Sequence, residues 1–131
     1  MPGKTEIASI EDVKLLVDSF YGKVQQDPLI GHIFNDRIRD RWPEHLEKMY
    51  RFWQTVLLGE HTYFGGPFPP HAQLPISKEH FDRWLLLFRQ TLDEHFEGPK
   101  ADEAKWRAWK MAEMFNAKIE YFRANNTKPL I

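Results

Sequence analysis

SIEDVKLLVDSFYGKVQQ, residues 9–26, carries the periodicity of an amphipathic helix. Ser9 is predicted to cap it, since a serine oxygen accepts an orphan backbone N–H at a helix start, and the acidic first turn suits that end. Asp27-Pro28 is predicted to end it. Apolar side chains recur at steps of three and four, as a helix with one buried face requires; they are Ile10, Val13, Val17, Phe20, Tyr21 and Val24.

Three further helices are predicted from the same kinds of residue, which cap or end a helix. Residues 28–40 are predicted to connect with a helical turn or two, and Pro43 to open a second long helix that Gly59 stops. The glycines and prolines of residues 60–70 favour a loop. Ser77 is predicted to cap a third helix, ended by Gly98-Pro99, and the last helix spans residues 101–123. No strand-like alternation is sustained, so the predicted class is all-α.

Length and composition define one domain. The 131 residues include no cysteine, which excludes disulfides, Cys-ligated zinc, iron–sulfur clusters and covalently attached haem. With 18 Lys and Arg against 19 Asp and Glu, nothing favours nucleic acid or an anionic membrane as a partner. The first residues contain no apolar run typical of a signal peptide, so we expect a cytoplasmic protein. Five Trp, ten Phe and four Tyr are more aromatic surface than a small helical core needs, and they suggest a pocket.

Two histidines are candidates for chemistry. His45 lies four, seven and eleven residues before Met49, Phe52 and Val56, at the border of an inward face, where it is either a site residue or a half-buried histidine bonded to a carbonyl. His71 follows a Pro-Pro pair on a short rigid segment, a placement that suits a metal-binding imidazole, although an exposed loop histidine is the commoner case.

The other histidines and the usual catalytic motifs give little evidence for a functional site. Surface positions are predicted for His32, His61, His80 and His95. Gly-rich phosphate loops, the nucleophile elbow, the His-Glu-x-x-His helix and the EF-hand loop are absent from the sequence. Tyr21 and Trp84 fit core packing, yet each brings one polar hydrogen that needs an acceptor when buried.

The order of several short motifs resembles the truncated haemoglobins, group III in particular. The resemblance spans residues 9–122. It includes Phe20-Tyr21-Gly-Lys-Val24, Trp42-Pro-Glu-His45, Phe52-Trp53, His71-Ala-Gln-Leu-Pro75 and Phe81-Asp-Arg-Trp84-Leu-Leu-Leu-Phe88. It implies a shortened globin, a two-over-two helical sandwich around b-type haem. The domain would cover residues 9–124, with an N-terminal extension at 1–8 and a C-terminal tail at 125–131.

The resemblance also implies roles for residues. His71 matches the proximal histidine that binds the iron. Tyr21, His45 and Trp84 match the distal side, where ligands bind. Helical phase alone adds candidates for the haem-contacting walls, which are Phe20, Met49, Phe52, Trp53, Phe81, Phe88 and Met111. Arg41 and Lys78 are candidates to pair with the haem propionates, although solvated surface charge is the role expected of both.

These roles predict a haem protein that binds oxygen, carbon monoxide or nitric oxide at an open sixth position of the iron. Tyr21 and Trp84 would donate hydrogen bonds to bound oxygen and slow its release. Redox chemistry on nitric oxide or peroxide is the enzymatic alternative, a peroxidase-like or nitric oxide dioxygenase activity. It would need a separate reductase, because the chain is too short for a flavin or nicotinamide domain. A third hypothesis is a haem-free helical interaction module.

Overall fold

The computed structural model describes residues 4–64 and 76–124. Its helices agree with the predicted all-α class, and within the described ranges the only β-type contact is an isolated bridge between Thr5 and Phe96. The elements are α1 (Ile10–Gln26), α2 (Gly31–Ile38), the short 3-10 helix η1 (Arg39–Arg41), α3 (Trp42–Leu58), α5 (Lys78–His95) and α6 (Pro99–Ala124).

The predicted caps are the ones that the helices use. The Ser9 N–H donates to the Asp12 carboxylate across the first turn of α1, at 3.2 Å, and Gly59 ends α3 in the left-handed region, with φ +70°. The predicted connector is more ordered than a turn or two, because α2 and η1 fill it. α6 begins at Pro99, two residues earlier than predicted, since proline suits the first position of a helix.

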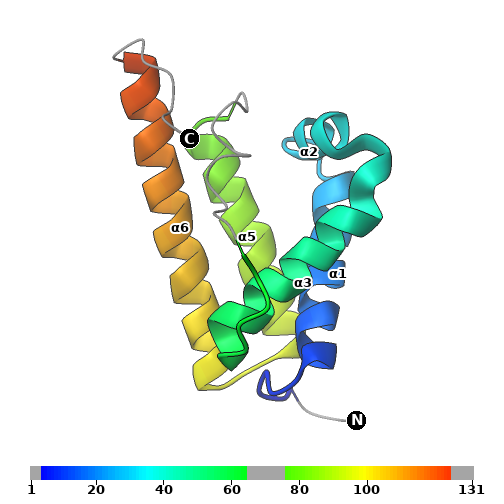
Figure 1. The fold of residues 1–131 in the computed structure, drawn as a ribbon. Helices are drawn as coiled ribbons and strands as arrows, with labels where there is room; N and C mark the ends of the chain where they lie inside the picture. The colour runs from blue at the N-terminus through cyan, green and yellow to red at the C-terminus, as the bar shows by residue number, and fades with distance from the viewer. Residues whose placement is uncertain (1–3, 65–75, 125–131) are drawn as a thin grey trace.

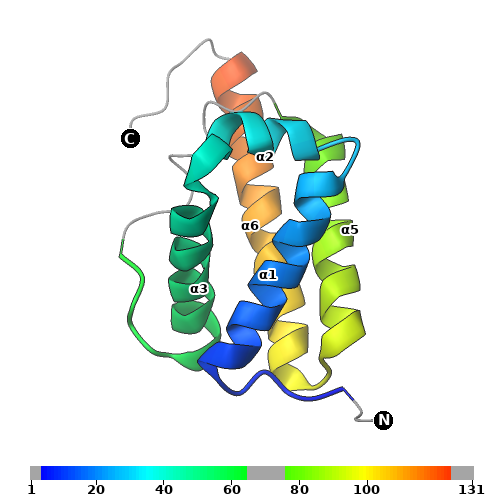
Figure 2. The same ribbon diagram turned by 90° about the vertical axis from the view of Figure 1, so that its right-hand side faces the viewer.

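The four long helices form two layers. α5 runs beside α6 in one layer, and α3 crosses α1 in the other (Figure 1). Viewed from the side, α1 lies in front of α5 and α6, with α2 crossing at one end (Figure 2). The side chains where the layers meet are almost fully buried, and they include Leu16, Phe20, Leu57, Phe88 and Leu92. This is the two-over-two arrangement that the sequence resemblance implied.

Residues 4–8 pack against the helices. Ile7 is 1% exposed, and the Glu97 N–H donates to the Thr5 carbonyl at 3.0 Å. The Glu6 carboxylate accepts the Lys100 N–H at the start of α6, at 2.9 Å. Residues 4–8 of the predicted N-terminal extension therefore contribute to the core and cap the last helix.

Candidate functional site

A cavity of about 670 Å³ lies between the two layers. Its wall includes five of the aromatic and sulfur-containing side chains singled out from helical phase, which are Met49, Phe52, Trp53, Phe81 and Met111. α3, α5 and α6 supply these side chains. The wall is therefore largely apolar, as small-molecule and cofactor sites usually are.

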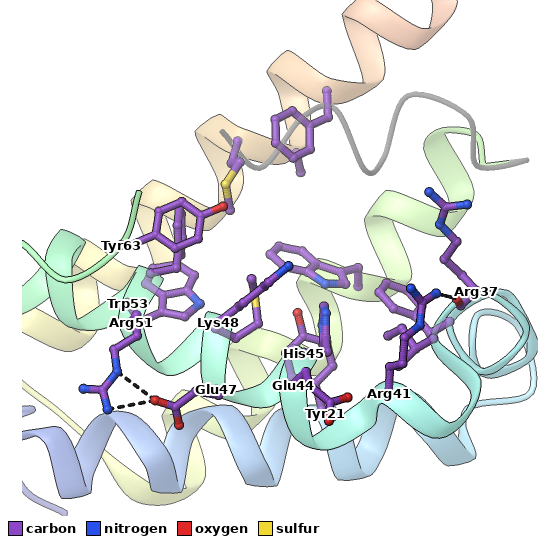
Figure 3. A pocket seen from close by; sticks show the side chains of 18 of the residues that line it. Tyr21, Arg37, Arg41, Glu44, His45, Glu47, Lys48, Arg51, Trp53 and Tyr63 are labelled. Atoms are coloured by element: carbon purple, nitrogen blue, oxygen red, sulfur yellow. Dashed lines mark hydrogen bonds and ion pairs between the residues drawn. The ribbon is translucent and has the colours of Figure 1, made fainter. Parts of the chain in front are cut away.

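Three polar aromatic side chains line the same cavity from three helices. Tyr21 comes from α1, His45 from α3 and Trp84 from α5. The ring centroids of Tyr21 and His45 are 5.0 Å apart, edge to face, and Trp42 packs against both rings. Figure 3 shows Tyr21 and His45 next to each other at the floor of the cavity. His45 therefore belongs to the cavity wall.

Tyr21 is a buried hydroxyl that stays protonated. Its side chain is 6% exposed, and burial raises its pKa above the ordinary value. Burial alone accounts for this raised pKa, and no hydrogen bond from residues 4–64 and 76–124 contributes to it. A neutral phenol can donate one hydrogen bond, so Tyr21 is a donor available to a ligand in the cavity.

Trp84 is held in place by a stack of rings. Its ring lies 5.5 Å from that of Phe88, at an interplanar angle of 3°, and Phe20 packs edge-on at 5.3 Å. Phe88 in turn stacks on Trp53. Phe20 and Phe88 were expected in the cavity wall, but neither is among its lining side chains. They pack against the Trp84 ring and fix its orientation. The expectation failed because helical phase separates inward from outward side chains but does not separate the cavity from the core.

Exposed side chains of both charges line the cavity where it meets solvent, with Glu44 and Glu47 beside the basic residues. Arg37, Arg41 and Lys48 line the cavity, and in Figure 3 the Lys48 side chain extends across it. Arg41 donates to the Arg37 carbonyl at 3.1 Å. No carboxylate lies within ion-pair distance of these three cations in the described part of the chain. Lys78 does not line the cavity and pairs with Asp82.

Tyr63 also lines the cavity, and sequence reasoning missed it. Thr55 accepts the N–H groups of Thr62 and Tyr63, both at 3.0 Å, which ties the segment after α3 back onto that helix. The Tyr63 ring then packs edge-on against Phe52 at 5.3 Å. The threonines at 55 and 62 were the available signal, since hydroxyl groups commonly bond to nearby backbone.

Two predictions about histidines have different outcomes. His71 lies outside the described residues. The surface position predicted for His80 holds only in part, because this half-buried residue lines the cavity and its Nδ1 accepts the Ser77 N–H at 2.9 Å. A helix-capping role at the third position usually falls to Glu or Gln, so the pattern did not indicate a histidine.

Two negative findings concern other kinds of site. Residues 4–64 and 76–124 contain no cluster of three or more His, Asp or Glu side chains that could hold a metal ion directly. Over the same ranges, no helix is long and apolar enough to cross a membrane.

The layers and the cavity together define a small protein of the two-over-two globin class. A family model described as bacterial-like globin matches residues 6–119. The chain belongs to this family.

Two comparisons place it more closely. The group 3 truncated hemoglobin ctb of Campylobacter jejuni is 39% identical over 94 aligned residues, and the match covers 69% of this chain and 74% of that protein. The crystal structure of a group III truncated hemoglobin from Campylobacter jejuni matches with a TM-score of 0.82 and 34% identity, and covers 89% of this chain and 95% of that chain. The resemblance to group III truncated haemoglobins is confirmed.

The cavity suits the haem that globins bind. Its volume of about 670 Å³ falls within the range of about 300–1,000 Å³ that is usual for cofactor sites. The aromatic and sulfur-containing wall matches an apolar disc, and the three cations at the mouth match its carboxylates. Tyr21, His45 and Trp84 leave one part of the cavity polar.

Proposed function

We propose that the protein binds b-type haem in this cavity and uses it to hold oxygen tightly. When bound, haem would supply an iron atom that can bind a diatomic ligand. His71 would hold the iron, as the family resemblance implies. Arg37, Arg41 and Lys48 would pair with the haem carboxylates.

The observation that carries the proposal is the convergence of Tyr21, His45 and Trp84 on one cavity. Tyr21 and Trp84 each have a hydrogen to donate, and oxygen gains negative charge on binding. A hydrogen bond to a charged group contributes about 1.5–3 kcal/mol. One donor would therefore slow oxygen release by roughly ten- to a hundredfold.

Nitric oxide and carbon monoxide would occupy the same position, and these donors could also act in chemistry on nitric oxide or peroxide. Such turnover would use electrons from a separate reductase. The observation that favours this second function is again that Tyr21, His45 and Trp84 line one cavity. Hydrogen-bond donors can polarise an O–O bond as well as stabilise bound oxygen. The globin family favours both functions over a haem-free interaction module.

Stopped-flow measurement of oxygen release tests the proposal. Tyr21→Phe and Trp84→Phe are each expected to release oxygen at least severalfold faster than the parent. Tyr50→Phe is the matched control, because its hydroxyl bonds to Asp18 and lies outside the cavity lining. Unchanged release in both cavity variants would contradict the proposed role of the donors.

Consumption of nitric oxide or peroxide separates the two functions. Oxygen-loaded protein that neither consumes nitric oxide nor accelerates peroxide-dependent oxidation, with reductant supplied, would contradict the enzymatic function and leave oxygen binding in place.

A further inference from the structure

Asp27 joins three helices through one buried carboxylate. Its side chain is 5% exposed and follows the last residue of α1. Oδ2 accepts the N–H groups of Leu29 and Ile30, at 2.9 and 3.0 Å, just before α2 begins. Oδ1 accepts Nη1 of Arg83, on α5, at 2.8 Å. The end of α1, the start of α2 and the first half of α5 are therefore connected at a single group.

Each of these three segments supplies a side chain to the cavity lining. Tyr21 is on α1, Ile30 precedes α2, and Trp84 is the residue after Arg83 on α5. Because helices move as stiff units, a shift of α5 relative to α1 would change where Trp84 lies relative to Tyr21.

The junction between α1 and α2 has little room for adjustment. A Cβ atom on Gly31 would lie 2.8 Å from the Val24 carbonyl oxygen and 2.9 Å from that of Gln25. Asn35 also donates to the Gln25 carbonyl, at 3.1 Å. With α2 seated on the last turn of α1, the ion pair to Arg83 ties the first half of α5 to this unit, in addition to the packing of Phe20 on Trp84 and Phe88.

We propose that Asp27 and Arg83 are positioning residues for the distal side of the cavity. Their ion pair fixes α5 against the α1–α2 junction, so that a bound ligand meets the hydroxyl of Tyr21 and the indole N–H of Trp84 in one geometry. This inference rests on the proposed function, because it concerns how the two donors are aligned. Neither Asp27 nor Arg83 lines the cavity, so both would act through their neighbours.

Infrared spectroscopy of the carbon monoxide complex tests the alignment. The C–O stretching frequency responds to hydrogen bonds and charge around the ligand, so one donor geometry is expected to give one dominant band in the parent protein. Arg83→Met leaves the buried Asp27 carboxylate without its counter-ion. We expect its band to shift or split and oxygen release to become about threefold faster or more, since donor contact is lost part of the time. Arg83→Lys keeps the charge, and should return both values toward those of the parent.

Asp27→Asn provides a second test. An asparagine oxygen can still accept the N–H groups at the start of α2, while the charge that holds Arg83 is lost. We expect the same change in the infrared band as for Arg83→Met. This variant decides the question if circular dichroism shows that Arg83→Met does not fold.

Lys23→Met is the matched control. Lys23 also links α1 to α5, through an ion pair to Glu94 at 2.6 Å and a hydrogen bond to Thr91 at 3.1 Å, and none of these residues lines the cavity. It should lower the melting temperature without moving the C–O band.

Failure of the positioning role and failure of the proposed function give different results. If Arg83→Met and Asp27→Asn lose stability but keep the parent band and the parent oxygen release, the pair has only a structural role and the inference is overturned. If the parent protein forms no carbon monoxide complex, or if Tyr21→Phe and Trp84→Phe both leave the band unchanged, the proposed function itself fails.

Discussion

Tyr21 shows which properties of a site residue can be predicted from sequence and which need the structure. The sequence placed it at the end of an inward stripe, and the structure puts its ring among Phe20, Phe34, Trp42 and His45 while its side chain borders the cavity. The hydroxyl could be predicted to need an acceptor. Its availability to a ligand could not be, because that depends on which groups the other helices bring near.

The ionisation of Tyr21 leads to a prediction about pH. Burial raises the pKa of this phenol above its ordinary value of about 10, and a raised pKa keeps an acid protonated to higher pH. The donor should therefore persist, and oxygen release should stay constant from about pH 7 to about pH 10. Stopped-flow traces in buffers across this range measure it. Faster release that titrates near pH 9 in the parent but not in Tyr21→Phe would contradict the prediction.

The pKa of Asp27 is shifted in the opposite direction and leads to a prediction about stability. Burial disfavours its charged form, but the N–H groups of Ile30 and Leu29 and the guanidinium of Arg83 together hold its pKa below the ordinary value. A depressed carboxyl pKa stabilises the fold above the unfolded value of about 3.9, and the stabilisation is lost as the pH falls through the folded value.

The free energy of unfolding, measured in urea between about pH 7 and pH 3, should therefore fall less steeply with acid in Asp27→Asn than in the parent. The slope should flatten without vanishing, because the pKa values of Asp93 and Glu94 are also lowered, by Lys105 and Lys23. Identical slopes in both proteins would show that Asp27 is not linked to folding.

At the scale of the elements, short polar signals predicted most helix ends. Ser9, Ser77 and Gly59 act at the ends predicted for them, because capping depends on residues within one turn. α2 was predicted only as a helical turn or two within a connector, since no polar cap stands next to it. The Asp27 carboxylate instead accepts the N–H groups of the two residues just before its start, across the turn that Pro28 introduces.

The start of α6 depends on a contact that no local pattern reveals. Gly98 has φ +102°, and a Cβ there would lie 2.7 Å from the Glu6 carboxylate that caps the helix. Gly98→Ala should lower the free energy of unfolding by about 1–2 kcal/mol, through backbone strain and displacement of Glu6.

Urea denaturation measures this loss, and Gly22→Ala is its control. Gly22 lies within α1 and nothing would meet a Cβ there within 4 Å, so alanine should stabilise by up to about 1 kcal/mol. A Gly98 variant as stable as the parent would mean that Glu6 and the loop adjust without cost.

At the scale of the whole molecule, the sequence resemblance predicted the fold correctly. The family depends on the order of motifs along the chain, which sequence preserves. The cavity wall was harder to predict, because Tyr63 and His80 reach it from a loop and a helix start, where helical phase does not apply. The mouth cations Arg37 and Lys48 were missed since a charged residue gives no periodic signal.

Haem binding should also stabilise the whole chain. A ligand that binds only the folded state raises its stability by about 2.7 kcal/mol when present at a hundredfold excess over its dissociation constant. The melting temperature of the haem-loaded protein should therefore exceed that of the apoprotein. Equal melting temperatures, followed by circular dichroism, would count against a haem that spans both helical layers.

The absorption spectrum of apoprotein titrated with haem, with His71→Ala beside it, tests the central claim most directly. We predict a sharp Soret band that saturates at one haem per chain in the parent. In His71→Ala we expect a large change in the ferrous and carbon monoxide spectra, reversed by added imidazole. A parent protein that stays colourless after haem is supplied, or a His71→Ala spectrum identical to the parent's, would contradict the account.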